Sequence, residues 1–182
     1  ESRGLGDVYK RQGNGGVGST SSIITYAMAG TYLVGEQDGG SSVYFAGGGA
    51  GGSKNDSDNY TAGTGGLGGG GDTPAPPQAT NTGTDGQAGA ANTGGGGGGA
   101  AFKGTGVSSA TGGAGGSGVV VIRVATGITA TFSGGVTANG STGGTIAPDT
   151  STGDNIWIVT ATTDASQTVE FSSTGNIGGR PS

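Results

Sequence analysis

The sequence lacks both cysteine and histidine. Their absence excludes disulfide bonds, thiol nucleophiles, Cys/His zinc sites and imidazole acid–base chemistry. Leu, Ile, Val and Phe together make up only 27 of the 182 residues, too few for the core of an ordinary α/β enzyme of this length. Apolar runs are also far shorter than the roughly 20 residues of a membrane span, so we expect no membrane insertion.

Glycine is what the sequence has in excess. It supplies 48 residues, and 36 of them lie between positions 13 and 118, whereas residues 145–174 contain only Gly153. Glycine-rich tracts commonly stay flexible, because ordering glycine costs more backbone entropy than ordering any other residue. The ordered alternative is a set of polyproline II-type glycine helices, which have three residues per turn and can bond to one another only between neighbouring chains. Composition alone leaves both outcomes open.

The first twelve residues, Glu1–Gln12, resemble the direct translation of a transposase adapter used to prepare shotgun sequencing libraries. We therefore treat them as an artefact and exclude them from the fold prediction. The remaining chain has four basic residues against ten carboxylates, a net charge of −6. An acidic chain with so few cations lacks the electrostatic footprint of a nucleic-acid-binding protein.

Strands are expected mainly after residue 118. The β-branched run at residues 119–124 is predicted to be a strand with one buried apolar side and Arg123 on its other side, and residues 128–132 are predicted to form a weaker strand. Asn139-Gly140 is a typical hairpin turn. Residues 155–162 and 167–172 are predicted to pair as a hairpin, with Trp157 packed inside the sheet. Because no window of ten residues shows a helical apolar period, we predict essentially no helix.

Catalytic and cofactor motifs are not supported by their context. Residues 13–18 and 63–68 match the dinucleotide fingerprint GxGxxG, but such matches are expected by chance here, and neither lies between a strand and a helix. The ten carboxylates show no paired pattern, so we expect a non-enzymatic protein without cofactors. Asn55–Asn59 gather side-chain oxygens and could form part of a calcium loop, with a solvated polar loop as the alternative.

Four strings resemble the glycine-rich domains of bacteriophage tail-fibre and adhesin proteins and of similar sequences from uncultured organisms. They are SSVYFAGGGAGG at 41–52, GTGGLGGGG at 63–71, ANTGGGGGG at 91–99 and GGAGGSGVVVIRVA at 112–125. The resemblance implies an all-β fold, a small β-sandwich with polyglycine II-like insertions. It also implies that residues 13–126 are the glycine-rich block and closing strand of one module, and that residues 127–182 are the opening strands of the next.

The same resemblance implies attachment to a host from a virion tail or an extracellular surface. We expect loop side chains to contact a host glycan or protein, with Tyr26, Tyr32, Tyr60, Phe102 and Lys103 as candidates because aromatic anchors dominate many interfaces. Other fibre subunits, including copies of the same chain, are further expected partners. The alternative is an extracellular structural fibre or cell-surface repeat that assembles by strand pairing.

Overall fold

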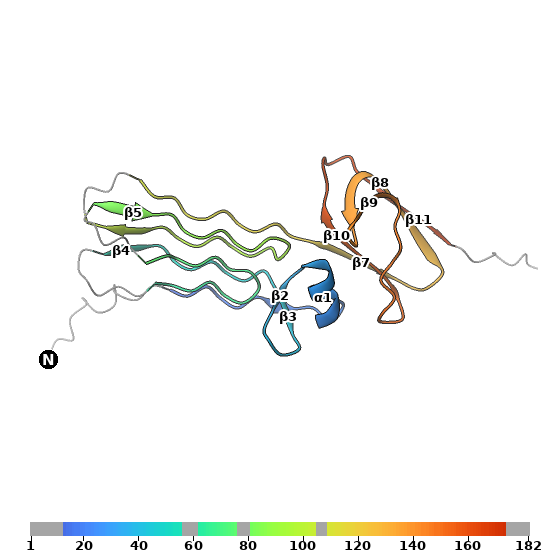
Figure 1. Ribbon diagram of the computed structural model, residues 1–182, viewed down its shortest axis with the longest axis horizontal. Coiled ribbons are helices and arrows are strands. Elements are labelled where there is room, and N and C mark those ends of the chain that lie inside the picture. Colours follow the sequence, from blue (N-terminus) through green and yellow to red (C-terminus); the bar gives the residue numbers. More distant parts are fainter. Residues whose placement is uncertain (1–12, 56–61, 76–80, 105–108, 174–182) are drawn as a thin grey trace, which may run out of the picture. The chain divides into compact units, whose positions relative to one another are not determined.

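The computed structural model describes residues 13–55, 62–75, 81–104 and 109–173 (Figure 1). The chain divides into two compact units, Glu1–Gly118 and Val119–Ser182. In the described residues the fold is all-β, as predicted, with three sheets and one short helix.

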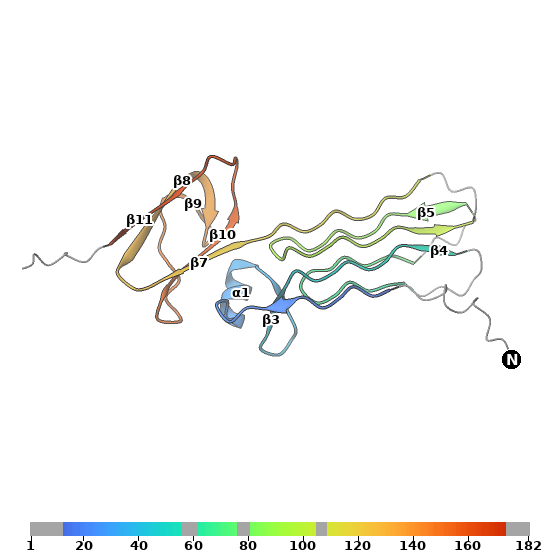
Figure 2. The same cartoon turned by 180° about the vertical axis from the view of Figure 1, so that it is seen from behind.

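The first unit consists largely of extended glycine-rich segments that run side by side (Figures 1 and 2). We call the following seven segments the glycine array: 13–18, 46–52, 63–67, 69–73, 85–90, 94–99 and 111–118. They have no regular strand pairing along most of their length, and their backbone groups bond from one segment to the next. The order of the first unit therefore depends on where these backbone groups find their partners.

Backbone hydrogen bonds in the array recur every third residue. Gly96 N–H donates to the carbonyl of Gly47 at 2.8 Å, and three residues later Gly99 N–H donates to Ala50, also at 2.8 Å. The same step joins other pairs of segments, as in Gly15 to Thr64 and Gly18 to Leu67, Gly113 to Gly98 and Gly116 to Gly95, and Gly86 to Thr111 and Gly89 to Ala114. A period of three is what helices with three residues per turn require.

The bonding partners arrange the array in two layers. Segments 13–18, 46–52, 94–99 and 111–118 are bonded in that order, and we call them the four-segment layer. The segments at 63–67, 69–73 and 85–90 are likewise bonded in sequence order and form the three-segment layer. Each segment of the second layer bonds to two adjacent segments of the first, so it lies in the groove between them.

Close packing explains why the central run, residues 94–99, is glycine throughout. A β-carbon at Gly95, Gly97 or Gly98 would lie 2.1, 1.9 or 2.0 Å from a carbonyl oxygen of a neighbouring segment. A side chain at any of these three positions would therefore collide with the backbone of a neighbouring segment. Segments at the edges have fewer neighbours, and they carry exposed side chains such as Val17.

The two ends of the array carry small elements (Figure 1). At one end lie β1 (Ser19–Thr20), α1 (Tyr26–Tyr32), β2 (Glu36–Gln37) and β3 (Val43–Phe45), with sheet order β1-β3-β2. At the other lie β4 (Ser53–Asn55), β5 (Thr82–Thr84) and β6 (Ala101–Lys103), with sheet order β4-β6-β5. At the α1 end, the Glu36 carboxylate accepts the N–H groups of Gly68 and Gly69 at 2.8 and 2.7 Å, which fixes the turn between two array segments.

Helix α1 differs from the prediction of essentially no helix. Its start is capped by Thr25, whose hydroxyl accepts from Met28 N at 3.2 Å, and it ends at Leu33 in the left-handed conformation with φ 53°. Met28 and Ala29 are its buried residues. A helix of seven residues is too short to show a helical apolar period, so its cap residue is the only sequence signal for it.

The second unit is a single sheet around a side-chain core. It contains β7 (Val120–Val124), β8 (Ile128–Ala138), β9 (Ser141–Thr145), β10 (Asn155–Ala161) and β11 (Val169–Ser173), in the order β11-β8-β10-β7 with β9 paired to β8. Asn139 and Gly140 form the predicted turn between β8 and β9, both with positive φ. Trp157 is fully buried, as predicted, and its Nε1 donates to the carbonyl of Ile146 at 2.8 Å.

The predicted hairpin of residues 155–162 and 167–172 is wrong. Both strands form, but β8 lies between them, so β10 and β11 are not paired with each other. Strand β8 takes both partners because they pair with different parts of it: β11 with residues 128–132, and β10 with Thr137 and Ala138. Gly135, which lies between these parts, has φ 99°. The two edges of β10 are instead taken by β7 and by β8.

Candidate functional site

The candidate contact residues fall at opposite ends of the glycine array. Tyr26 and Tyr32 are the first and last residues of α1, and both are half-buried. Phe102 and Lys103 are half-buried residues of β6, at the other end of the array (Figure 1). Tyr60 lies outside the described residues. The structure therefore places Phe102 and Lys103 next to each other on β6, on its opposite faces, and away from the α1 pair.

Only the β6 end lies away from the point where the chain leaves the array. The last array segment ends beside α1, since Gly94 N–H donates to Ser117 O at 2.8 Å and Asn92 Nδ2 donates to Leu33 O at 3.2 Å. At the β6 end, the Phe102 ring lies across β5, and a β-carbon at Gly83 would be 3.2 Å from its Cδ1 atom. The glycine in β5 thus leaves room for the aromatic ring.

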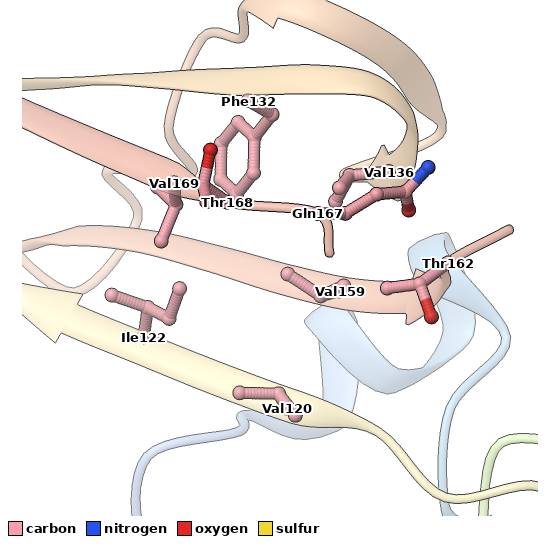
Figure 3. Close-up of a pocket in the computed structure, with 9 residues that line it drawn as sticks. All are labelled: Val120, Ile122, Phe132, Val136, Val159, Thr162, Gln167, Thr168 and Val169. Carbon is pink, nitrogen blue, oxygen red and sulfur yellow. The ribbon is translucent and has the colours of Figure 1, made fainter. Parts of the chain in front are cut away.

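A second candidate is an apolar cleft in the second unit, with a volume of about 140 Å³ (Figure 3). It opens between β7, β8, β10 and β11, and it is lined by Val120, Ile122, Phe132, Val136, Val159, Thr162, Gln167, Thr168 and Val169. None of these residues has a titratable side chain. Val120 is 61% exposed, so the apolar side of β7 is only partly covered, contrary to the expectation of one buried side.

Polar groups at the rim of the cleft hold its loop in place. Gln167 Nε2 donates to Gly134 O at 2.9 Å, and its Oε1 accepts from Thr163 N at 3.0 Å. Nearby, both the hydroxyl and the N–H of Ser166 donate to Asp164, which lowers the pKa of that carboxyl below its ordinary value. The sequence showed no sign of this cleft, because its walls come from four strands that are separated along the chain.

Two charged side chains of the second unit form an ion pair at its surface. Arg123, on the face of β7 that the sequence placed away from the apolar side, donates from Nε to Asp154 Oδ2 at 2.6 Å. The two side chains are 50% and 30% exposed, so this pair contributes about 0–1 kcal/mol to stability. It fixes the side chain of Arg123 without making it part of the cleft.

Metal-binding side chains are not gathered in the part of the chain that the structure describes, where no three His, Cys, Asp or Glu residues form a group. Of the proposed calcium loop Asn55–Asn59, only Asn55 is described, as the last residue of β4, and the others lie outside the described residues. The single described helix is too short and too polar to cross a bilayer. Comparison with known proteins found no matching family model, no similar curated protein and no similar solved structure.

Proposed function

We propose that this chain is a non-enzymatic attachment module of a phage-type tail fibre or adhesin, in which the glycine array holds a host-binding surface at one end. One observation carries the proposal. The segments of the array are held by backbone hydrogen bonds of 2.7 to 3.0 Å at three-residue intervals, and such a bonded array resists bending in a way that a glycine linker does not.

The host-binding surface is assigned to the β4-β6-β5 sheet. This end lies away from the exit of the chain near Ser117, so a receptor can reach it without meeting the α1 end of the first unit. Phe102 supplies an aromatic ring and Lys103 a cation, both on β6. Sugars and protein side chains are commonly recognised by such aromatic anchors.

Binding to bacterial cells tests the assignment. The labelled full chain is expected to bind cells that display surface polysaccharide, and Phe102→Ala is expected to lower this binding about 30-fold, as loss of an aromatic anchor usually does. Val17→Ala serves as the control, since Val17 is an exposed apolar residue of an edge segment and lies outside the β4-β6-β5 sheet. Equal circular dichroism spectra of the two variants show that both are folded.

The alternative function, a structural fibre, would use the second unit. Within the described residues β7 pairs only with β10, which leaves its other edge open, and Val120 beside that edge is 61% exposed. Open apolar edges pair readily with strands of other molecules. If the chain binds no cell in a broad panel and forms filaments by itself, host attachment is wrong and the fibre function stands in its place.

A further inference from the structure

The four-segment layer has an outer face that turns away from the three-segment layer. In its first segment Gly15 points inward, where a β-carbon would be 1.8 Å from Gly48 O. Asn14 lies on the side of the other layer, because its Oδ1 accepts from Thr64 N at 3.1 Å. With three residues per turn, the remaining row, which includes Gly16, must point to the outer face.

The last segment of the same layer is arranged in the same way. Gly113 and Gly116 point inward, where β-carbons would lie 2.0 and 1.9 Å from carbonyl oxygens of segment 85–90. Ser117 is directed to the edge, where its hydroxyl donates to Asn92 Oδ1 at 3.3 Å. The remaining row is again glycine and faces outward. We call the surface formed by Gly13, Gly16, Gly49, Gly97, Gly112, Gly115 and Gly118 the glycine face.

Several glycines of this face are not required by the chain itself. A β-carbon at Gly13, Gly16 or Gly118 would meet no atom within 4 Å, and at Gly112 or Gly115 it would make an ordinary contact of 3.5 Å. None of the five has a positive φ. Alanine at such positions stabilises a protein by about 0.4–1 kcal/mol through the unfolded state, so glycine here is explained by a partner that approaches as closely as the array segments approach one another.

The middle of the face presents backbone groups in need of partners. In the central segments the residues that flank Gly49 and Gly97 all donate their N–H groups to other segments. Among the described residues, Gly49 and Gly97 themselves make no hydrogen bond through N–H or C=O. On the opposite side of the same layer, the equivalent groups are bonded to the three-segment layer. The array therefore demonstrates within one chain how such a face binds another layer of extended backbone.

We propose that the glycine face binds the glycine face of a second copy of this chain. Segments 13–18 and 111–118 run in one direction, and segments 46–52 and 94–99 run in the other, so the order of directions is the same from either edge. A two-fold axis parallel to the segments would place segment 13–18 of one copy opposite segment 111–118 of the other, and segment 46–52 opposite segment 94–99. Each segment would then face one that runs in the same direction. The face carries no charged side chain, which lets two acidic chains of net charge −5 approach without repulsion at the contact.

The contact is small. A six-residue segment spans about 19 Å at 3.1 Å per residue, so the interface lies at the weak end of protein contacts, and we expect a dissociation constant on the order of 100 µM. This association goes beyond host attachment and does not depend on it. If the chain dimerises but binds no cell, host attachment is wrong and the dimer stands. If it binds cells as a monomer, the dimer is wrong and host attachment stands.

Sedimentation of the full chain from about 10 µM to 1 mM tests the proposal, since this range brackets the expected dissociation constant. The wild type is expected to change from monomer to dimer. The variant Gly16→Gln/Gly115→Gln places two side chains on the glycine face and is expected to weaken the dimer at least tenfold. The matched control, Val17→Gln/Ala114→Gln, alters the neighbouring rows of the same segments and is expected to leave the dimer intact.

A wild type that stays monomeric throughout, a face variant that still dimerises, or a control that loses the dimer equally would overturn the proposal. Amide NMR of the wild type provides a measurement that does not depend on how the variants fold. The amide resonances of Gly49 and Gly97 are expected to shift with concentration, while that of Gly98, already bonded to Gln87 O at 2.8 Å, stays in place. Unchanged resonances at Gly49 and Gly97 would likewise contradict it.

Discussion

The two units reach an ordered interior by opposite means. In the second unit, side chains fill the interior around Trp157, whose ring contacts Phe132 and Phe171 at centroid distances of 6.5 and 6.3 Å. In the glycine array the interior is backbone, and neighbouring segments approach until no β-carbon fits between them. The low count of apolar residues therefore argues against an ordinary side-chain core only. It does not argue against order that arises from hydrogen bonds between backbone segments.

The strongest test of the side-chain route is Trp157→Ala. Removal of a fully buried aromatic side chain leaves a large cavity, and it also removes the donor that bonds Ile146 O. The second unit should lose about 4 kcal/mol of unfolding free energy. Thermal unfolding followed by far-UV circular dichroism, which does not require the tryptophan, measures the loss. Amide hydrogen exchange in the glycine array should stay unchanged. A loss of protection in the array as well would mean that the two units do not fold independently.

The corresponding test of the backbone route adds a single methyl group. In Gly97→Ala the new β-carbon would lie 1.9 Å from Gly113 O, and there is no flexible side chain that could move aside. We expect the first unit to lose about 3 kcal/mol, the upper range for an overpacked site.

The matched control for that variant is Gly16→Ala, at a position where a β-carbon meets nothing within 4 Å. At protein concentrations that keep the chain monomeric, it should be neutral or stabilise the unit by about 0.5 kcal/mol. Hydrogen exchange of the glycine amides reports both effects. Equal behaviour of the two variants would show that the array is not close-packed.

The sequence predicted the second unit better than the first. The strand at β7, the Asn139-Gly140 turn and the buried Trp157 were predicted from local patterns and are confirmed, although the apolar side of β7 is only partly covered. The pairing of β10 with β11 was wrong because strand order depends on which edges meet in space. Proximity along the chain favoured a hairpin, whereas the sheet places β8 between the two strands.

In the first unit the sequence left open whether the glycines were ordered. The signal was present in the spacing: Asn14 and Val17, and likewise Thr111, Ala114 and Ser117, recur at intervals of three, which marks the face of each edge segment that carries side chains. What spacing cannot supply is the neighbour of each segment, since glycine has no side chain to encode a pairing. The cleft in the second unit was missed for a related reason, because its walls meet only after the sheet has formed.

One turn of the array also depends on a side chain, and substitution of Glu36 measures how much that side chain contributes to the free energy of unfolding. Its carboxylate accepts the N–H groups of Gly68 and Gly69 in a partly buried site, so Glu36→Ala leaves two donors without an acceptor. We expect the first unit to lose about 2 kcal/mol of unfolding free energy.

Asp38 is the matched control, because its carboxylate also accepts two N–H groups, from Gly40 and Ser42, but in an exposed loop. Since water can replace it there, Asp38→Ala should cost about 0.5 kcal/mol. Thermal unfolding of the two variants gives the difference, and equal losses would show that the array turn does not depend on a buried acceptor.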